Sequence, residues 1–175
     1  KLDGLKMCYI GDGNNMANSL IVGGLKTGMS VSVACPENYH PASTTLAFAK
    51  KYDCFELTDD PIKAAKDADV IYTDVWVSMG EPDEVWEKRI KELSPYKVTK
   101  EVMANAKDTA IFLHCLPAFH DLKTKIGAEM GQRFGIEDME VTDEVFESAQ
   151  SKVFDEAENR MHTIKAVMVA TLGEF

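Results

Sequence analysis

The sequence predicts an α/β fold: a doubly wound, Rossmann-like parallel sheet flanked by helices on both faces, followed by a long C-terminal helix. Two observations predict it. Short β-rich runs alternate with longer helical patterns along the chain, and these runs are almost continuously apolar. Strands that alternate with helices require right-handed crossovers, and continuously apolar strands are typical of a parallel sheet covered on both faces. The 175 residues have about the length of one domain.

Strands are predicted from compact apolar and β-branched runs at residues 6–10, 30–35, 54–57, 70–75 and 109–114. Helices are predicted from helical periodicity at residues 15–28, 43–51, 61–67 and 153–172. The apolar stripe of the last helix consists of Phe154, Ala157, Met161, Ile164 and Met168, spaced by three and four residues. Residues 118–135 have weak periodicity, so a mobile loop is expected there.

Composition and charge exclude several classes of protein. The chain has 29 acidic and 19 basic residues, a net charge of −10 and no basic stripe, so no nucleic-acid partner is expected. Its late apolar stretch, residues 166–170, is far shorter than the roughly 20 residues of a membrane helix. The N-terminus has neither a signal-peptide pattern nor an initial Met, which favours a fragment. The four cysteines lack zinc-ribbon or disulfide-framework spacing, which favours a cytoplasmic setting.

The turn after the first predicted strand has two interpretations. Gly11-Asp12-Gly13 resembles the start of a dinucleotide-binding fingerprint, with Glu37 placed for a ribose, although Met16 replaces the third glycine. The same glycines also suit a tight turn. Asn14 and Asn15 follow at the start of a helix, where a cap and amide donors attract a carboxylate or a phosphate.

Two further strand ends carry polar chemistry. Asp74 lies at the end of its strand, where it serves either as a loop cap or as the partner of an ammonium group. Ser78, Met79 and Gly80 follow in a loop whose backbone amides are able to face a carboxylate. Because ligands collect at the carboxyl ends of parallel strands, the ends at residues 11–15, 74–80 and 114–117 are expected to converge.

Cys115 is a candidate nucleophile, metal ligand or buried thiol. His120 and Asp121 lie nearby in the sequence and raise a zinc hypothesis, but His114 and Cys115 are adjacent and point to opposite faces of a strand, so no metal is expected. Arg160 is either an exposed residue of a charged stretch or a clamp for a phosphate or carbonyl group.

Taken together, these motifs resemble the signature of the ornithine carbamoyltransferase family. The motifs are Gly-Asp-Gly-Asn-Asn at 11–15, Asp-x-x-x-Ser-Met-Gly at 74–80, His-Cys-Leu-Pro at 114–117 and Glu-Asn-Arg at 158–160. They occur in the family's order and cover essentially the whole chain. The resemblance implies transfer of a carbamoyl group from carbamoyl phosphate to the δ-amine of L-ornithine, giving citrulline and phosphate, with neither metal nor organic cofactor.

The resemblance also implies roles for individual residues. The implied ornithine site consists of Asn15 and the Met79 amide on the α-carboxylate, with Asp74 and Ser78 on the α-ammonium. Cys115 is implied beside the reacting amine, the Leu116 carbonyl against the carbamoyl nitrogen, and Arg160 against carbamoyl phosphate. Cys115, Asp74 and Arg160 are the implied catalytic residues. An amine attacks only when neutral, so such a site must disfavour the δ-ammonium and keep the α-ammonium charged.

One departure limits the resemblance. The family's Ser-x-Arg-Thr-Arg phosphate loop is absent, and the only arginines are Arg89, Arg133 and Arg160. Residues 1–175 are therefore expected to form the L-ornithine-binding domain of a carbamoyltransferase, without its carbamoyl-phosphate-binding N-terminal domain, and to be inactive alone. The last helix is expected to pack on that missing domain, leaving its stripe partly exposed here. The parent enzyme is expected to be a homotrimer or a multiple of one.

Two other functions remain open on the sequence. A carbamoyltransferase for another amine, such as putrescine, would leave the carboxylate-binding groups unused. A dinucleotide-binding Rossmann module would use the glycine turn and Glu37.

Overall fold

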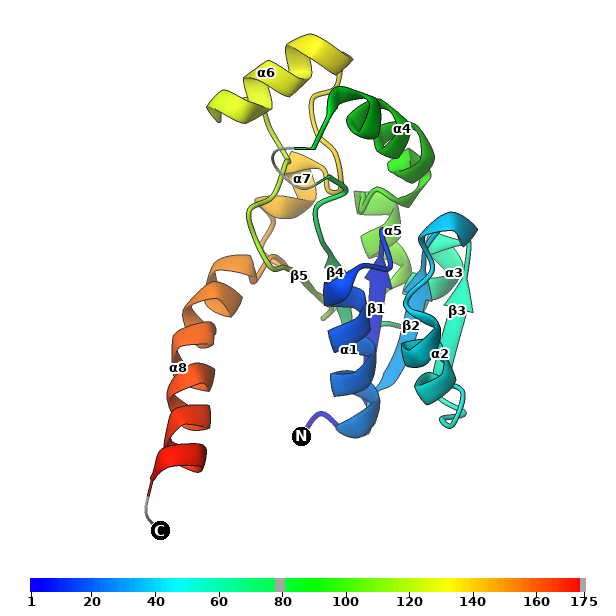
Figure 1. The fold of residues 1–175 in the computed structure, drawn as a ribbon, viewed down its shortest axis with the longest axis vertical. Helices are drawn as coiled ribbons and strands as arrows, with labels where there is room; N and C mark the ends of the chain where they lie inside the picture. Colours follow the sequence, from blue (N-terminus) through cyan, green and yellow to red (C-terminus); the bar gives the residue numbers. More distant parts are fainter. Residues whose placement is uncertain (78–80, 174–175) are drawn as a thin grey trace.

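A computed structural model describes residues 1–77 and 81–173, and it contains the predicted parallel sheet (Figure 1). The strands are β1 (Lys6–Ile10), β2 (Ser30–Ala34), β3 (Phe55–Thr58), β4 (Val70–Thr73) and β5 (Ile111–His114). Their order in the sheet is β3-β2-β1-β4-β5, and every neighbouring pair is parallel. The order reverses direction at β1, so a switch point lies between β1 and β4, where open α/β sheets bind ligands.

Helices cover both faces of the sheet, as predicted. The helices are α1 (Asn15–Lys26), α2 (Ser43–Ala49), α3 (Pro61–Ala65), α4 (Asp83–Leu93), α5 (Lys100–Asn105), α6 (Lys125–Phe134), α7 (Asp143–Phe146) and α8 (Val153–Leu172). Alternate residues of β1 face opposite sides: Met7 and Tyr9 pack under α1 and α2, whereas Cys8 and Ile10 pack under α3, α5 and α7. The near-continuous apolar character of the strand reflects burial on both faces.

The sequence explains where α1 begins. Gly11 has φ +130°, a conformation that side chains rarely adopt, and this allows the chain to turn sharply at the end of β1. Asn14 is the N-cap: its side-chain oxygen accepts hydrogen bonds from the amides of Met16 and Ala17 at 2.9 and 3.2 Å. The turn is therefore fixed by residues that the sequence places directly after the strand.

The prediction of a loop over 118–135 is wrong for its second half, because residues 125–134 form α6. Thr124 caps its N-terminus and Gly135 ends it in the left-handed conformation. Gly127 and Gly131 lie inside the helix and weaken its sequence signal, since glycine is a poor helix former. Close packing requires glycine at both positions. An added Cβ on Gly127 would lie 2.5 Å from the Asp121 carbonyl oxygen, and one on Gly131 would lie 2.6 Å from the Leu122 side chain.

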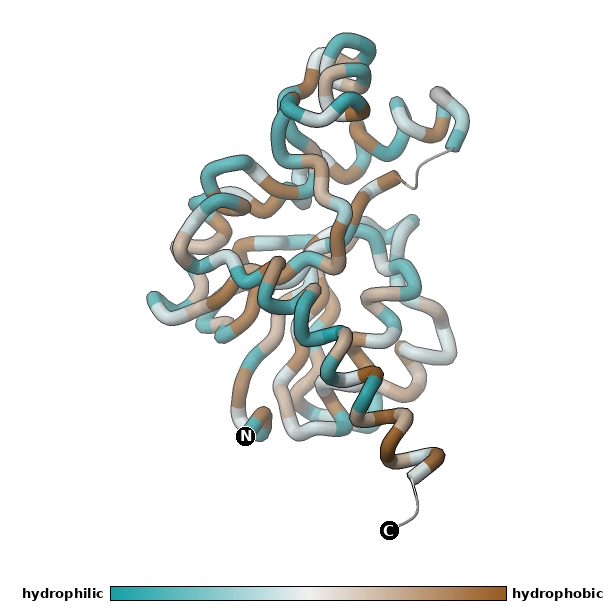
Figure 2. The backbone as a smooth tube through the Cα atoms, turned by 90° about the vertical axis from the view of Figure 1, so that its left-hand side faces the viewer, coloured by the Kyte–Doolittle hydropathy of each residue, from teal (hydrophilic) through white to brown (hydrophobic). Residues whose placement is uncertain are grey.

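The last helix, α8, extends away from the sheet (Figure 1). Val153 at its start is buried, but the side chains beyond it are largely exposed, and Figure 2 shows hydrophobic positions recurring toward the C-terminus. Phe154 is 68% exposed, Met161 53% and Met168 54%, so the expectation of a partly exposed apolar stripe is confirmed. Within the described ranges, the structure contains no helix with the length and apolarity needed to cross a bilayer.

Candidate functional site

Asp74 lies where the ends of β1, β4 and β5 meet. Its side chain is 6% exposed and receives three hydrogen bonds. The Asn14 amide nitrogen donates to Oδ2 at 2.7 Å, while the Cys115 thiol and the Val75 backbone amide donate to Oδ1 at 3.0 and 2.8 Å. The Val75 bond is a local turn contact, but the other two join separate strand ends. Asp74 therefore links all three ends in addition to capping its own turn.

The asparagine that reaches Asp74 is Asn14, whereas the residue that the resemblance assigns to the substrate is its neighbour Asn15. Asn15 is the first residue of α1 and is exposed, so it lies beside the contact without taking part in it. Ser78 and Met79, the other residues expected on the substrate, lie outside the described part of the chain.

Cys115 is a neutral hydrogen-bond donor. Burial raises the pKa of its thiol to about 12, and the hydrogen bond to the Asp74 carboxylate acts in the same direction because it favours the protonated sulfur. A thiol with this pKa carries no charge near pH 7. Of the roles left open by the sequence, that of a thiolate nucleophile is therefore the least suited to this environment.

An open cavity of about 480 Å³ lies beside Cys115 and is bounded on its other side by α8. Arg160 lines it, together with Met16, Tyr72, His114 and other residues of α8. Among the residues that the structure describes, the Arg160 guanidinium has no hydrogen-bond or ion-pair partner in the protein. The structure thus brings Asp74, Cys115 and Arg160 to one region, and leaves the guanidinium available to an anion or a carbonyl oxygen.

Leu116 lies on a backbone segment held by a buried pair, His114 and Glu140, both fully buried. The Leu116 amide donates to Nδ1 of His114 at 2.9 Å, so this nitrogen carries no proton and Nε2–H donates to Glu140 Oε1 at 3.2 Å. The same carboxylate oxygen accepts the Phe119 amide at 2.6 Å. This support for the segment was missed in the sequence, where the only signal is an acidic residue between the apolar Met139 and Val141.

The glycine turn supports the tight-turn interpretation. The Gly13 amide donates to the Tyr39 carbonyl at 2.8 Å, and a Cβ on Gly13 would lie 2.3 Å from that oxygen and 2.5 Å from the Pro41 nitrogen. Asp12 pairs with the Arg89 guanidinium. The protein's own backbone therefore occupies the space that a pyrophosphate would need, and this weighs against a dinucleotide at the turn.

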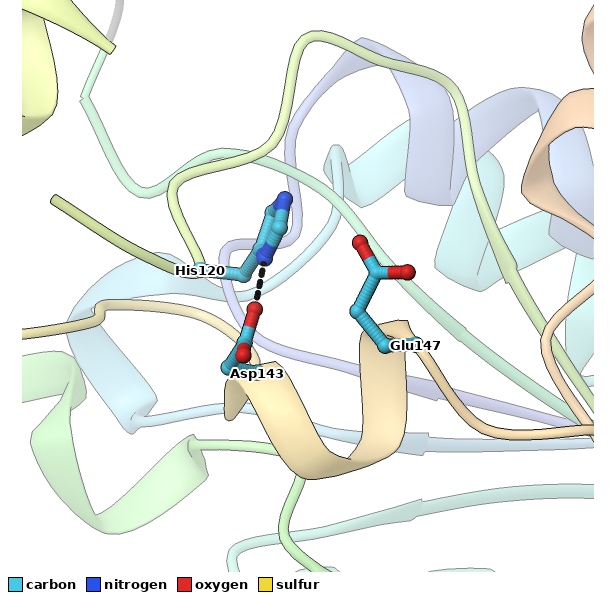
Figure 3. Close-up of side chains that lie close together, drawn as sticks. All are labelled: His120, Asp143 and Glu147. Atoms are coloured by element: carbon cyan, nitrogen blue, oxygen red, sulfur yellow. Dashed lines mark hydrogen bonds and ion pairs between the residues drawn. The ribbon is translucent and has the colours of Figure 1, made fainter. Parts of the chain in front are cut away.

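The zinc hypothesis named His120 and Asp121, but the structure separates their contacts. His120 Nδ1 lies 2.7 Å from Asp143 Oδ1, and its ring stacks on Phe146 with centroids 3.6 Å apart. Glu147 completes a cluster in which potential ligand atoms lie within 4.8 Å of one another (Figure 3). The hydrogen bond and the ring contact hold His120 in place, and none of the cluster lines the cavity beside Cys115.

The fold and these contacts define an α/β domain that presents a small polar site at the carboxyl ends of its strands. Residues 3–171 match the family model described as aspartate/ornithine carbamoyltransferase, Asp/Orn binding domain. The chain belongs to the aspartate/ornithine carbamoyltransferase family.

Individual relatives agree with this assignment. The chain is 55% identical over 177 residues to the catabolic ornithine carbamoyltransferase of Treponema denticola and 54% identical over 176 residues to that of Bacillus cereus. These alignments cover 98% and 99% of this chain but 52% and 53% of the relatives. The ornithine carbamoyltransferase structure from Pyrococcus furiosus superimposes with a TM-score of 0.83 at 42% identity, over 100% of this chain and 52% of that one. The chain thus spans about half the length of the curated relatives it matches.

Proposed function

We propose that residues 1–175 are the L-ornithine-binding half of an ornithine carbamoyltransferase. The complete enzyme transfers a carbamoyl group from carbamoyl phosphate to the δ-amine of L-ornithine, releasing citrulline and phosphate. The observation that carries the proposal is the contact of buried Asp74 with Cys115 and Asn14, next to the cavity lined by Arg160. The names of the relatives support the choice of substrate.

The two amino groups of ornithine require different protonation states, because the α-ammonium must stay charged and the δ-amine must be neutral to attack. The site is suited to both. Asp74 supplies a buried carboxylate for the α-ammonium, which must stay charged. Cys115, whose pKa is raised to about 12, supplies no negative charge that would hold a proton on the δ-amine. A neutral δ-amine beside this thiol is therefore free to attack the carbamoyl carbon.

The remaining roles follow from position. Asn15 is the first residue of α1, where its side-chain amide and the helix dipole favour the α-carboxylate. The Met79 amide is its proposed companion on the α-carboxylate, and Ser78 is proposed to join Asp74 on the α-ammonium. Arg160 stabilises charge on the carbamoyl oxygen or the phosphate, while the Leu116 carbonyl accepts from the carbamoyl nitrogen. Neither a metal nor an organic cofactor takes part in this scheme.

The partner of this half is a carbamoyl-phosphate-binding N-terminal domain. The exposed apolar side chains of α8 are the surface proposed to pack on it, which would bury Met161 and Met168. The whole enzyme is proposed to be a cytoplasmic homotrimer or a multiple of one, free of nucleic-acid and membrane partners.

Calorimetry on the purified chain tests the substrate. L-ornithine and L-norvaline should bind, because each carries the α-carboxylate and α-ammonium, and putrescine and NAD should not. Asp74→Asn should abolish ornithine binding, and the exposed Asp108→Asn serves as the matched control. Binding of putrescine alone, or of NAD alone, would replace the proposal with the corresponding alternative.

An activity assay tests the missing half. The chain alone should form no citrulline, whereas a chimera that joins it to the N-terminal half of the Treponema denticola relative should do so. The intact Treponema denticola enzyme is the positive control. Turnover by the isolated chain at the rate of the intact enzyme would contradict the proposal that it is only half of the site.

A further inference from the structure

Glu156, in the first turn of α8, joins the helix to two strands. Its Oε1 accepts the Tyr72 hydroxyl of β4 at 2.6 Å, and its Oε2 accepts the backbone amide of His114, the last residue of β5, at 3.1 Å. It is partly buried, unlike the residues that follow it on α8. Together with Val153, Glu156 therefore fixes how α8 leaves the sheet.

The hydrogen bond to His114 continues a pattern along the outer edge of β5. The amide of Phe112 donates to the Gln150 carbonyl, and the amide of Lys152 donates back to the Phe112 carbonyl, both at 2.9 Å. The next outward-facing amide of β5 belongs to His114, where the chain has already turned into α8. A carboxylate from the helix takes the place of the backbone at this point, which ties the helix direction to the end of the strand.

Arg160 follows Glu156 by four residues, so the two lie on the same face of α8. Both line the cavity next to Cys115. An acid and an arginine at this spacing ordinarily form an ion pair. Here each oxygen of Glu156 already has a donor, and among the described residues the guanidinium of Arg160 has no hydrogen-bond or ion-pair partner.

The Tyr72 hydroxyl stays protonated and therefore remains a hydrogen-bond donor to Glu156. Burial raises the pKa of its hydroxyl well above the usual range, and the hydrogen bond to Glu156 adds to the effect. The hydroxyl thus keeps its proton near neutral pH and donates a hydrogen bond to Glu156.

We propose that Glu156 is a positioning residue for carbamoyl transfer: held by Tyr72 and His114, it sets the direction of α8 so that Arg160 stands beside Cys115 with its guanidinium free for carbamoyl phosphate. This inference rests on the proposed function. Glu156 does not touch the substrate in this scheme and acts through Arg160.

Hydrogen exchange on the isolated chain tests the structural step. Tyr72→Phe keeps the ring and removes only the hydroxyl, and Glu156→Gln removes the charge. Both should speed exchange of the amides at 157–163 by about tenfold or more, while Glu158→Gln, an exposed acid on the same helix, should not. Unchanged exchange in Tyr72→Phe and Glu156→Gln would overturn the proposal, whatever the activity of the chimera.

Kinetics of the Treponema denticola chimera test the functional step. Tyr72→Phe should raise the KM for carbamoyl phosphate by about tenfold or more, and the calorimetric affinity of the chain for L-ornithine should change by less than about threefold. Equal losses for both substrates would indicate general damage and overturn the positioning role. If the unsubstituted chimera makes no citrulline, the proposed function fails, and hydrogen exchange still decides whether Glu156 anchors α8.

Discussion

The Sγ atom of Cys115 lies 3.0 Å from Oδ1 of Asp74, so the thiol after β5 donates to the carboxylate after β4. Strand register produces this contact. Thr73 of β4 pairs with His114 of β5. Because the strands are parallel, the residues that follow them, Asp74 and Cys115, also lie side by side. This hydrogen bond across the strand ends thus adds to burial in raising the pKa of the Cys115 thiol.

Cys115 is expected to react slowly with iodoacetamide. Since burial and the bond to Asp74 raise its pKa to about 12, almost no thiolate exists at pH 8. Asp74→Asn removes the carboxylate that favours the protonated sulfur, so the pKa should fall and alkylation should accelerate. Peptide mass spectrometry over pH 7–10 measures both effects, with exposed Cys54 as the internal control. Equal rates for Cys115 and Cys54 at pH 8 in the unsubstituted chain would contradict this environment.

The free energy of unfolding should fall as pH rises above about 9. Burial raises the pKa of Cys8 from 9.0 to about 12, so between these values the unfolded thiol loses a proton that the folded thiol keeps. The folded state binds more protons in that window, and stability is lost with rising pH at about 1.4 kcal/mol per pH unit for a fully buried thiol. Urea unfolding between pH 8 and 10 should show a shallower decline for Cys8→Ala. Cys54→Ala is the control and should retain the slope of the original chain.

Two glycines, one in the turn before α1 and one inside α1, should respond in opposite ways to alanine. Gly13→Ala places a methyl group 2.3 Å from the Tyr39 carbonyl and should destabilise the fold by about 1–3 kcal/mol or more. Gly23→Ala meets nothing within 4 Å inside α1 and should stabilise it by about 0.5–1 kcal/mol. Urea unfolding compares the two directly. A neutral Gly13→Ala would mean that residues 39–41 do not pack over the turn.

Removal of Glu140 should be costly because the His114 ring and the Phe119 amide donate to it, and the Leu116 amide in turn donates to His114. Glu140→Ala leaves the buried His114 ring and the Phe119 amide without an acceptor, which should cost about 3 kcal/mol or more. Glu140→Gln keeps one acceptor oxygen and should cost less. Exposed Glu137→Ala is the control, and urea unfolding is the measurement. A loss in Glu140→Ala no larger than in Glu137→Ala would show that the pair does not support the segment.

The sheet was predictable because most of its strands are short runs rich in apolar or β-branched residues, bounded by turn-forming residues. The helices α4 to α7 were not predicted. α6 contains two glycines, and α7 spans only Asp143–Phe146, so its existence depends on packing of Val145 and Phe146 against the sheet layer. Local sequence cannot report a helix that tertiary contacts stabilise.

The candidate site was predictable to the extent that strand ends converge. Asp74 and Cys115 are in contact as the convergence implies, but the hydrogen bond from Asn14 to Asp74 depends on which residue caps the helix, and the sequence does not specify this. Glu140 and Glu156 were missed because their partners are distant in sequence: His114 lies 26 and 42 residues away, and Tyr72 lies 84 residues from Glu156. Such pairs follow from topology and leave no motif.

The contacts along the outer side of β5 also protect the molecule against uncontrolled assembly. The outward amides of Phe112 and His114 are both occupied, by a backbone carbonyl and by the Glu156 carboxylate. An incoming polypeptide therefore meets no vacant hydrogen-bonding row on that border and cannot extend the sheet there into a fibril-like stack. The chain can thus expose the apolar side chains of α8 without also offering an unpaired strand edge beside them.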